Sequence, residues 1–369
     1  MLDFSPGAYY NIVKDNNKRE YNMKTYLLSE NGNFYKANLH CHTTLSDGRR
    51  TPEQIAGMYR AHGYSVVAFT DHNIMIPHPE LCTDDFLALT GYEININSPG
   101  YPEKDKKSCH VCFIALDDED PEQPLFTSSY LKNATLENEP RVKRDRSKPE
   151  FIRNYDVECI NEMIRIGRDN RFFVTYNHPA WSLADYNDYM NFHGMNAMEI
   201  ANYGTICLGL PDYNDRVYND MLNGGERIFC IATDDNHNKK DEADGNFDSF
   251  GGWTMIKADK LDYRSVTSAL EAGNFYASMG PEIKSLWFED GEVHITTSPA
   301  ATISLITGIR YSKRRVMTDG EPLTHTHFKI LPNCRWFRID VVDEAGCHAN
   351  TNAYFVDQFT FPEETEVKA

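Results

Sequence analysis

The chain has 369 residues, of which 41% are hydrophobic and 25% charged, and its formal net charge is −18. These values are typical of a globular protein with two domains or one large domain and an appendage. The negative charge argues against generic binding to a nucleic-acid backbone or an anionic membrane. No apolar run reaches the ~18–20 residues of a membrane span, and no signal peptide is visible at the N-terminus. Nine scattered cysteines favour a reduced, cytoplasmic protein.

Residues 1–36 are polar and aromatic and are expected to form an N-terminal extension. From residue 37, predicted strands and helices alternate. A strand over 36–40 is followed by a helix that Thr51 caps, with Pro52 in its first turn, and that ends near Gly63. The further strands are expected over 65–70, 86–94, 108–116, 171–176, 197–201, 227–232 and 253–258, with helices over 156–168, 212–222 and 263–272. This alternation predicts a parallel sheet, either open or closed as a barrel.

Residues 117–150 interrupt the alternation with an acidic run followed by a basic one. A loop of this length in a compact domain is often a lid or a binding loop. The alternative is a solvated excursion whose two charge runs neutralise each other.

The pattern changes near Gly280-Pro281. Residues 281–369 alternate between apolar and polar side chains and contain turn signals such as Asp319-Gly320. This part predicts a small all-β sandwich domain, which leaves 37–280 as the larger domain.

Metal-binding residue types recur where the predicted strands of the larger domain end. His40 and His42 are two residues apart at the end of a strand, so their side chains point to the same side and can hold one metal ion. Asp71-His72 follows the next strand in the same way. Burying many such groups without a metal would be costly, and a set of His, Asp and Glu without thiolate suits Zn, Mn or Fe. The nine candidate ligands are His40, His42, Asp47, His72, Glu93, His110, His178, Asp235 and His237.

Three nearby groups are given other roles. Cys109 and Cys112 form a CxxC within a predicted strand, where they would face opposite sides, so we interpret them as core cysteines. Asp71 is expected to cap the strand end, with orientation of an imidazole as the alternative. Glu199 is expected to be a buried hydrogen-bonding partner of the site.

These motifs, taken in order, resemble those of the PHP (polymerase and histidinol phosphatase) superfamily over residues 37–280. The segment Phe275–Pro281 also resembles a two-domain subgroup that continues into a β-sandwich. The motifs are His40-x-His42, Ser46-Asp47-Gly48, Thr70-Asp71-His72, Gly91-Tyr92-Glu93, His110, Asn177-His178-Pro179 and Asp235-Asn236-His237.

The resemblance implies a distorted (β/α)7 TIM-like barrel with a site for two or three divalent metal ions, followed by an immunoglobulin-like sandwich. In the trinuclear arrangement of the family, one ion would be held by His40, His42, Glu93 and Asp235. Glu93 would bridge to a second ion held with His110 and His178, and a third would lie between Asp47, His72 and His237. The doublet Asp234-Asp235 leaves a one-residue ambiguity, and the D-x-H spacing favours Asp235.

We therefore expect a metal-dependent phosphoesterase that hydrolyses a small phosphorylated metabolite or nucleotide through a metal-bridging hydroxide. Catalytic roles fall to Glu93, Asp235 and His237. No long nucleic acid or membrane is expected as a partner, and the sequence does not set the oligomeric state. The alternatives are an amidohydrolase-type enzyme acting on a C–N bond and a non-catalytic, metal-stabilised interaction protein. The candidate contacts to substrate are Arg141, Lys143, Arg144, Arg216, Lys239 and Lys240.

Overall fold

The computed structural model describes residues 24–100 and 106–361. These residues form two compact units. The larger comprises residues 32–279, and the smaller comprises residues 280–361 together with 24–31. Among the described residues, no helix combines the length and apolar character needed to cross a membrane. All nine cysteines are free thiols.

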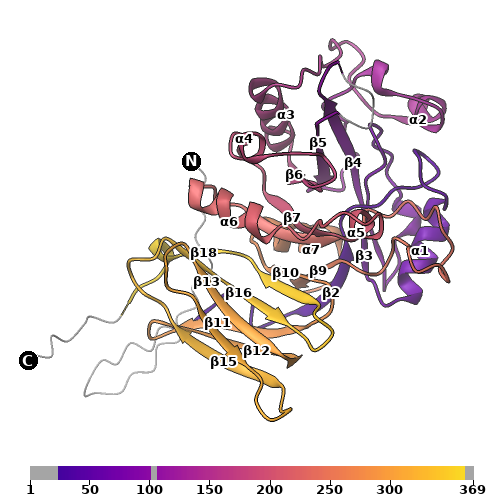
Figure 1. Ribbon diagram of the computed structural model, residues 1–369. Helices are drawn as coiled ribbons and strands as arrows, with labels where there is room; N and C mark the ends of the chain where they lie inside the picture. The colour runs from indigo at the N-terminus through magenta and orange to yellow at the C-terminus, as the bar shows by residue number, and fades with distance from the viewer. Residues whose placement is uncertain (1–23, 101–105, 362–369) are drawn as a thin grey trace, which may run out of the picture. The chain divides into compact units, whose positions relative to one another are not determined.

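The larger unit is built on one sheet, whose long strands β4 and β5 are prominent in Figure 1. Along it, β2, β3 and β4 are mutually parallel, as are β6, β7 and β8. The strands follow the order β10 (Phe275–Ser278), β9 (Trp253–Ala258), β2 (Asn33–Asn38), β3 (Val66–Phe69), β4 (Leu87–Asn97), β5 (Ser108–Ala115), β6 (Phe172–Tyr176), β7 (Ala197–Asn202) and β8 (Phe229–Thr233).

The prediction of a purely parallel sheet is wrong for two strands. β5 is antiparallel to both β4 and β6, and β9 is antiparallel to β2 and β10. The reason is visible for β5, because only ten residues, 98–107, connect it to β4. Parallel neighbours need a longer crossover, usually with a helix. The four-residue strand β10 was not predicted.

Main-chain hydrogen bonds join the segments that follow β2 and β8. The amide of Asp235 donates to the carbonyl of His40 (3.0 Å), and the amide of His42 donates to the carbonyl of Asn236 (3.1 Å). The chain ends of two strands that are distant in the sheet order therefore meet, and both carry candidate ligands.

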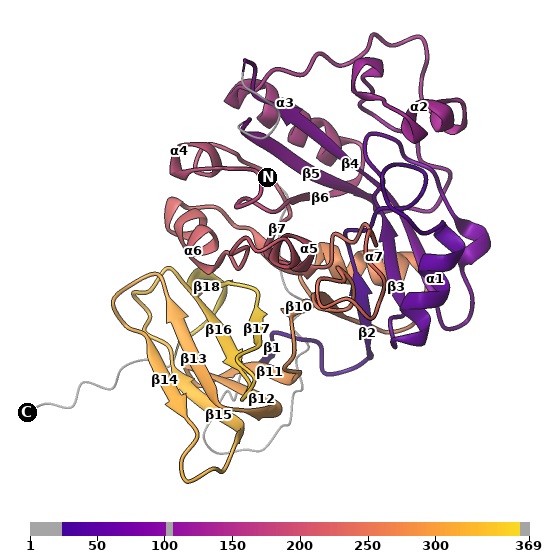
Figure 2. The same ribbon diagram turned by 45° about the vertical axis from the view of Figure 1, so that its right-hand side comes forward.

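Three of the longer helices begin at capping side chains, of which Thr51 was predicted. The helix predicted over 212–222 instead spans 215–224 and has no side-chain cap. Thr51 forms a capping box at the start of α1 (Pro52–Ala61), and the side chains of Asp156 and Asp262 accept hydrogen bonds at the starts of α3 (Val157–Asp169) and α7 (Tyr263–Glu271). Figures 1 and 2 show α3 alongside β5 and β6, and α1 near β3. The remaining helices are α2 (Ala134–Asn138), α4 (Tyr186–Tyr189), α5 (Tyr203–Cys207) and α6 (Asp215–Gly224).

The insertion 117–150 packs onto the rest of the unit. Its buried residues Phe126, Leu131 and Val142 form one cluster with Leu45, Ile74 and Ile76. Leu45 and Ile74 belong to the segments that follow β2 and β3. The insertion therefore covers loops that carry His42 and His72, while its own ion pair between Lys143 and Asp120 (2.7 Å) lies at the surface.

In the smaller unit, described residues 280–361 form strands and one short 3-10 turn. Tyr26 of β1 lies opposite Trp287 of β11, so residues 24–31 join this unit rather than the larger one. The first antiparallel sheet is β1 (Thr25–Tyr26), β11 (Ile283–Glu289), β12 (Glu292–Ala300) and β15 (Leu323–Lys329). The second contains β14 (Lys313–Val316), β13 (Thr302–Thr307), β16 (Trp336–Val342) and β17 (His348–Thr351), and β18 (Tyr354–Phe355) pairs with β16.

Candidate metal centre

All nine predicted ligands lie in or just after strands of the larger unit. Glu93 and His110 lie within β4 and β5, and the others follow β2, β3, β6 and β8. Eight of the nine, together with Cys112, fall into overlapping groups whose potential ligand atoms lie within 4.8 Å of one another. The ninth, His178, lies 3.1 Å from Glu93. The groups are His40/His42/Asp235, His72/Glu93/His110, His42/Asp47/His72/His237 and His40/Glu93/Cys112.

The first group is centred on the two histidines after β2. The Nε2 atoms of His40 and His42 lie 3.1 Å apart. Oδ1 of Asp235 lies 3.2 Å from the first and 3.0 Å from the second. The carboxylate of the adjacent Asp234 turns away, because it accepts hydrogen bonds from the amides of Phe250, Gly251 and Gly252. The geometry thus places Asp235, and not Asp234, beside the paired imidazoles.

Glu93 connects the groups. Its Oε1 lies 3.3 Å from Nε2 of His40, 3.0 Å from Nδ1 of His110 and 3.1 Å from Nε2 of His178. Its Oε2 lies 2.8 Å from Nδ1 of His72. The side chain is fully buried. One carboxylate therefore faces four imidazoles from four different segments, as a bridging ligand would.

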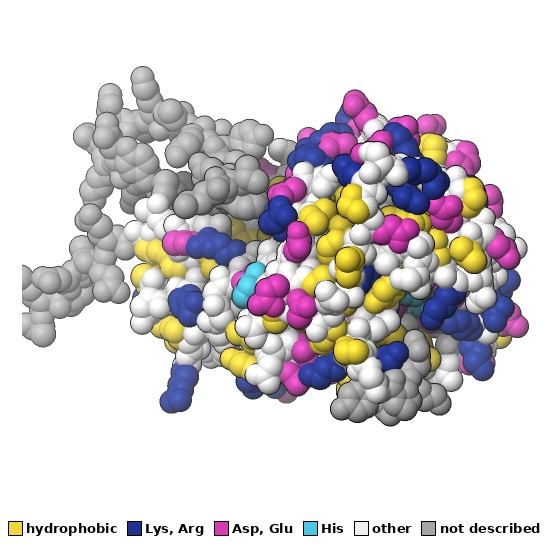
Figure 3. Space-filling model, turned by 90° about the horizontal axis from the view of Figure 1, so that it is seen from above, with side chains coloured by type: hydrophobic (Ala, Val, Ile, Leu, Met, Phe, Trp, Pro, Cys, Tyr) yellow, Lys and Arg dark blue, Asp and Glu magenta, His cyan; other side chains and the backbone are white. Residues whose placement is uncertain are grey.

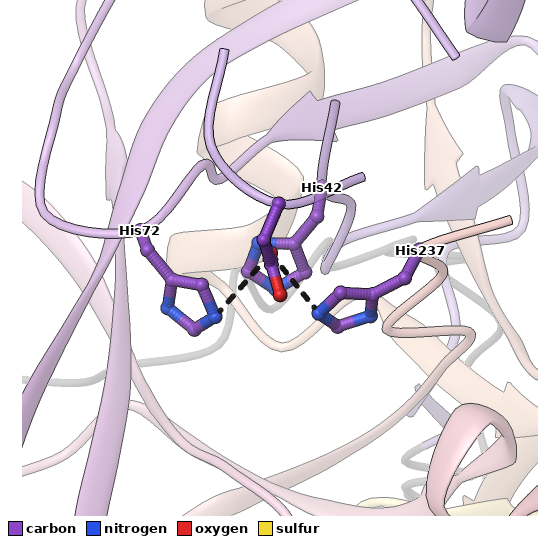
Figure 4. A group of neighbouring side chains, drawn as sticks. His42, His72 and His237 are labelled. Carbon is purple, nitrogen blue, oxygen red and sulfur yellow. Dashed lines mark ion pairs between the residues drawn. The ribbon is translucent and has the colours of Figure 1, made fainter. Parts of the chain in front are cut away.

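Figure 4 shows the group formed by His42, His72 and His237 around a carboxylate, which belongs to Asp47. Oδ1 of Asp47 lies 3.3 Å from Nε2 of His237 and 3.7 Å from Nε2 of His72. The Asp47 side chain is 47% exposed, so this group is the one most open to solvent.

Sequence reasoning assigned Cys112 to the core, and the structure also places it beside the site. It is fully buried and belongs to a group with His40 and Glu93. Burial raises the pKa of its thiol to about 11. Its Sγ accepts a hydrogen bond from the side-chain amide of Asn177 (3.1 Å).

Several buried atoms in the centre lack a hydrogen-bond partner. They are Nδ1 of His42, Oε2 of Glu93 and Oδ1 of Asp235. The two oxygens lie 2.8–3.2 Å from imidazole nitrogens, but these contacts do not have hydrogen-bond geometry. Buried polar atoms are normally satisfied, so each orphan calls for an explanation. A divalent cation supplies one, because it accepts electron pairs from carboxylate oxygens and neutral imidazole nitrogens at once. The donor set therefore fits divalent metal ions.

The pKa values of the histidines depend on the carboxylates and imidazoles around them. Burial opposes protonation of His178 and His237, but contacts with Glu93 and Asp47 respectively raise their pKa values to about 9. By contrast, burial and the neighbouring His72 and His237 lower the pKa of His42 to about 3. The carboxylates of Glu93 and Asp47 are stabilised by nearby positive charge. Without a metal, protonated His178 and His237 supply this charge, and a bound metal ion would replace the protons.

Two candidate ligands sit in strained backbone conformations. His178 and Asp235 have φ values of 28° and 50°, a region that non-glycine residues rarely adopt and that is often found at functional sites. Gly204, at the start of α5, supports the second of these. A Cβ at Gly204 would lie 2.8 Å from the carbonyl oxygen of Asp235, so only glycine allows this close approach.

A second layer of side chains orients the imidazoles. Glu199, fully buried, accepts hydrogen bonds from Nδ1 of His40 (2.7 Å), the amide of His178 (2.8 Å) and the hydroxyl of Thr233 (2.7 Å). This is the role expected for it. A proton held on Nδ1 leaves Nε2 of His40 free to bind a metal. Asp71 binds Thr43 and Ser46 in the loop after β2, which is the capping role and not contact with an imidazole.

The predicted substrate cations lie in different surroundings. Lys239 is 3.3 Å from Asp47, at the open group. Arg216 is bound to Asp220 within α6, Arg144 to Glu139 within the insertion, and Arg141 to Asn138. Lys143 and Lys240 pair with Asp120 and Asp244. Of these six, Lys239 alone is placed by a described contact at a candidate ligand.

Arg153 was not predicted from the sequence. Its guanidinium donates to the side chains of Thr127 (3.0 Å) and Asn73, and to the carbonyl of Asn95 (2.8 Å). All three acceptors are neutral, and burial lowers the pKa of Arg153 to about 10. One of these acceptors, Asn73, directly follows the candidate ligand His72 in the chain. A lone arginine after a long insertion gives no pattern that could have identified it.

On the face of the molecule shown in Figure 3, cationic and acidic side chains are interspersed with hydrophobic ones. The net charge of −18 is therefore not concentrated there in a field of one sign.

No family model and no curated protein matches the chain. Solved structures do. A two-domain protein from Bacteroides vulgatus, containing a predicted PHP-like metal-dependent phosphoesterase, is 14% identical, with 86% of this chain and 93% of that chain covered and a TM-score of 0.42. A protein from Bifidobacterium adolescentis, provisionally assigned as a metal-dependent phosphoesterase, is 15% identical over 58% of this chain and 91% of its own, with a TM-score of 0.33.

An amidohydrolase from Chromobacterium violaceum, solved with bound sulfate and no metal, is 13% identical over 55% of this chain and 87% of its own, with a TM-score of 0.34. The first of the three structures is named for the superfamily that the sequence motifs resemble. The chemistry of this chain is argued below from its own side chains.

Proposed function

We propose that this chain is a PHP-type, metal-dependent phosphoric-ester hydrolase acting on a small phosphorylated metabolite or nucleotide. The observation that carries the proposal is the position of Glu93, a buried carboxylate that faces His40, His72, His110 and His178 at 2.8–3.3 Å. A structural metal needs one closed ligand shell. A shared carboxylate between adjoining groups instead favours a multinuclear hydrolytic site.

For the ions we propose the ligand sets that the family resemblance implies. His40, His42, Glu93 and Asp235 would hold one ion, supported by the contacts of His40 with Glu93 and Asp235. Glu93 with His110 and His178 would hold a second, supported by contacts of 3.0 and 3.1 Å. Asp47, His72 and His237 would hold a third at the more exposed edge. Bound divalent ions lower the pKa of water, clamp phosphoryl oxygens and stabilise the charge that develops on the leaving oxygen.

The protein's own side chains supply orientation and charge. Glu199 holds the Nδ1 proton of His40. Lys239, beside Asp47, places a cation at the exposed group, where an anionic ester would arrive. Arg153 adds fixed positive charge behind Asn73. Together these groups favour a substrate with a negative charge at the site of reaction, as a phosphoester has.

The fold that we propose for residues 37–280 is the distorted (β/α)7 barrel. The hydrogen bonds between the segments after β2 and β8 support this closure. For residues 281–369 we propose the immunoglobulin-like sandwich, supported by the two antiparallel sheets of the smaller unit.

The experiment is a substrate panel with metal-loaded protein. Purified protein is incubated with Mn, Zn or Fe(II) and offered phosphomonoesters, a phosphodiester and simple amides, with the release of phosphate, alcohol or amine as the readout. We expect metal-dependent cleavage of at least one phosphoester, absent from Asp235→Asn. Cleavage of amides alone would favour the amidohydrolase alternative. Full metal loading with no turnover of any ester would contradict the proposal.

A further inference from the structure

A tryptophan stands beside two of the candidate ligands with much of its surface exposed. The ring centroid of Trp181 lies 5.1 Å from that of His110 and 5.1 Å from that of His178. The interplanar angles are 67° and 79°, so the contacts are edge-to-face. The residue is nevertheless 43% exposed. Much of the indole surface is therefore left uncovered by the described residues.

The backbone that carries Trp181 is held firmly. After His178, the amide of Ser182 donates to the carbonyl of His178 (3.0 Å), and the Ser182 hydroxyl lies 3.2 Å from Nδ1 of the same residue. The amide of Leu183 donates to the carbonyl of Ala180 (3.2 Å). The turn that orients a candidate ligand thus also fixes the position of the tryptophan next to it. A rigid aromatic surface binds a ligand with little loss of conformational entropy.

An exposed indole at the edge of an anion-binding site has an evident use. Aromatic side chains stack on planar rings, and such stacking contributes about 1–3 kcal/mol per base in nucleic-acid-binding proteins. The phosphoryl group of a nucleotide would sit at the ligand groups, and its base is the part that extends away from them. Because Trp181 contacts His110 and His178, it is near enough to these candidate ligands for the base of a bound nucleotide to reach it.

We propose that Trp181 is a specificity-determining residue that stacks on the planar ring of the substrate, and that the preferred substrates are nucleotide-like phosphoesters rather than small aliphatic ones. This inference rests on the proposed function and narrows its substrate class. The rival role is purely structural, in which Trp181 only shields the imidazoles of His110 and His178. If that role were correct, replacing Trp181 would change the kinetics of every substrate to the same extent.

The test compares two substrates in four proteins. Adenosine monophosphate carries a planar ring, and glycerol 3-phosphate does not. The proteins are wild type, Trp181→Ala, Trp181→Phe and the control Tyr186→Ala. Tyr186 is a matched exposed aromatic (56%) on α4, whose ring packs on Tyr189. Metal content is measured for each protein.

For Trp181→Ala we expect KM for adenosine monophosphate to rise about 5- to 150-fold, in line with the stacking energy. The kinetics of glycerol 3-phosphate and the metal content should stay near wild type. Trp181→Phe should recover most of the affinity, and Tyr186→Ala should match wild type. Equal losses for both substrates, or loss of bound metal, would overturn the proposal in favour of the structural role.

A binding measurement keeps the inference independent of turnover. Adenosine monophosphate should quench tryptophan fluorescence in the metal-loaded wild type and much less in Trp181→Phe. If wild type hydrolyses no ester of the panel described above, the proposed function fails, and the quenching still decides whether Trp181 binds a ring. Quenching that is identical in the two proteins would overturn the inference even if phosphoesters are hydrolysed.

Discussion

The Nε2 atoms of His40 and His42 face each other at 3.1 Å, with Oδ1 of Asp235 about equally close to both. Glu199 occupies Nδ1 of His40, so the Nε2 atom of that ring is the one available to a metal. Two nitrogen lone pairs and a carboxylate oxygen directed at one point repel one another unless a cation lies between them. This arrangement leads to the first predictions.

Replacing Asp235 with Asn should remove hydrolysis while leaving the fold intact. The substitution deletes the charge that the paired imidazoles share, and we expect a loss of metal affinity of at least about 100-fold, the upper end of the effect of altering residues that only orient ligands. Metal content by elemental analysis and far-UV circular dichroism are the measurements. Full activity with unchanged metal content would show that Asp235 is not part of the centre.

The neighbouring Asp234→Asn provides the matched control. Asp234 is fully buried and accepts hydrogen bonds from three backbone amides and from the hydroxyl of Tyr59 (2.8 Å). In the asparagine variant the side-chain NH2 group would face backbone amides that are also donors. The lost hydrogen bonds should lower the free energy of unfolding by about 1–3 kcal/mol. We expect a lower Tm with metal binding retained at saturating metal. A variant that loses metal and keeps its Tm would reverse the two assignments.

Chelation should destabilise the larger unit. The candidate ligands come from β4, β5 and the segments after β2, β3, β6 and β8, so a metal that binds only the folded state adds stability by mass action. At a free metal concentration of 100 times Kd, the gain is about 2.7 kcal/mol. Thermal unfolding with EDTA, and then with Mn, Zn or Fe(II) restored in turn, measures it. A Tm that does not respond to any of these metals argues against the centre.

Glu199→Gln should weaken metal binding without removing a ligand. The glutamate accepts the Nδ1 proton of His40 and the amide proton of His178. Glutamine keeps the shape but lowers the basicity of the imidazole, and altered orienting residues typically cost 10–100-fold in metal affinity. A metal titration followed by activity should show the shift. If Glu199→Gln binds metal as wild type does while Glu199→Ala fails to fold, the residue serves packing alone.

Asp212 predicts a pH dependence of stability that lies outside the ligand set. Its carboxyl is fully buried, its Oδ2 has no hydrogen-bond partner, and burial raises its pKa from 3.8 to about 6. A raised pKa in the folded state means that the protonated form is favoured by folding. The resulting stability is present below about pH 4 and is lost as the pH rises through 6.

Asp212→Asn should therefore be more stable than wild type at pH 8, by up to roughly 3 kcal/mol, while the difference shrinks toward pH 4. The asparagine can keep its oxygen toward Asn214, which donates to the aspartate. Urea unfolding of both proteins from pH 4 to 8 gives the comparison. If the difference in the free energy of unfolding does not change with pH, ionisation of Asp212 does not destabilise the folded protein.

The sequence alone determined which residues could form the site and the kind of element that carries each. Period-two apolar runs and capping residues such as Thr51 act locally, and so they fixed most strands and helices. The same-side rule for His40 and His42 also needed no more than local geometry. The motifs gave the order of the candidate ligands, and the family resemblance implied which of them would share an ion.

Tertiary structure decided the rest, because it depends on contacts between distant segments. The antiparallel direction of β5 followed from a short connection and not from its own residues. The D-x-H spacing favoured Asp235 over Asp234, and the tertiary structure shows why, because the amides of 250–252 hold the Asp234 carboxylate away from the imidazoles. Trp181 and Arg153 carry no pattern in the chain. Contacts between distant segments place Trp181 against His110 and join Arg153 to Asn73.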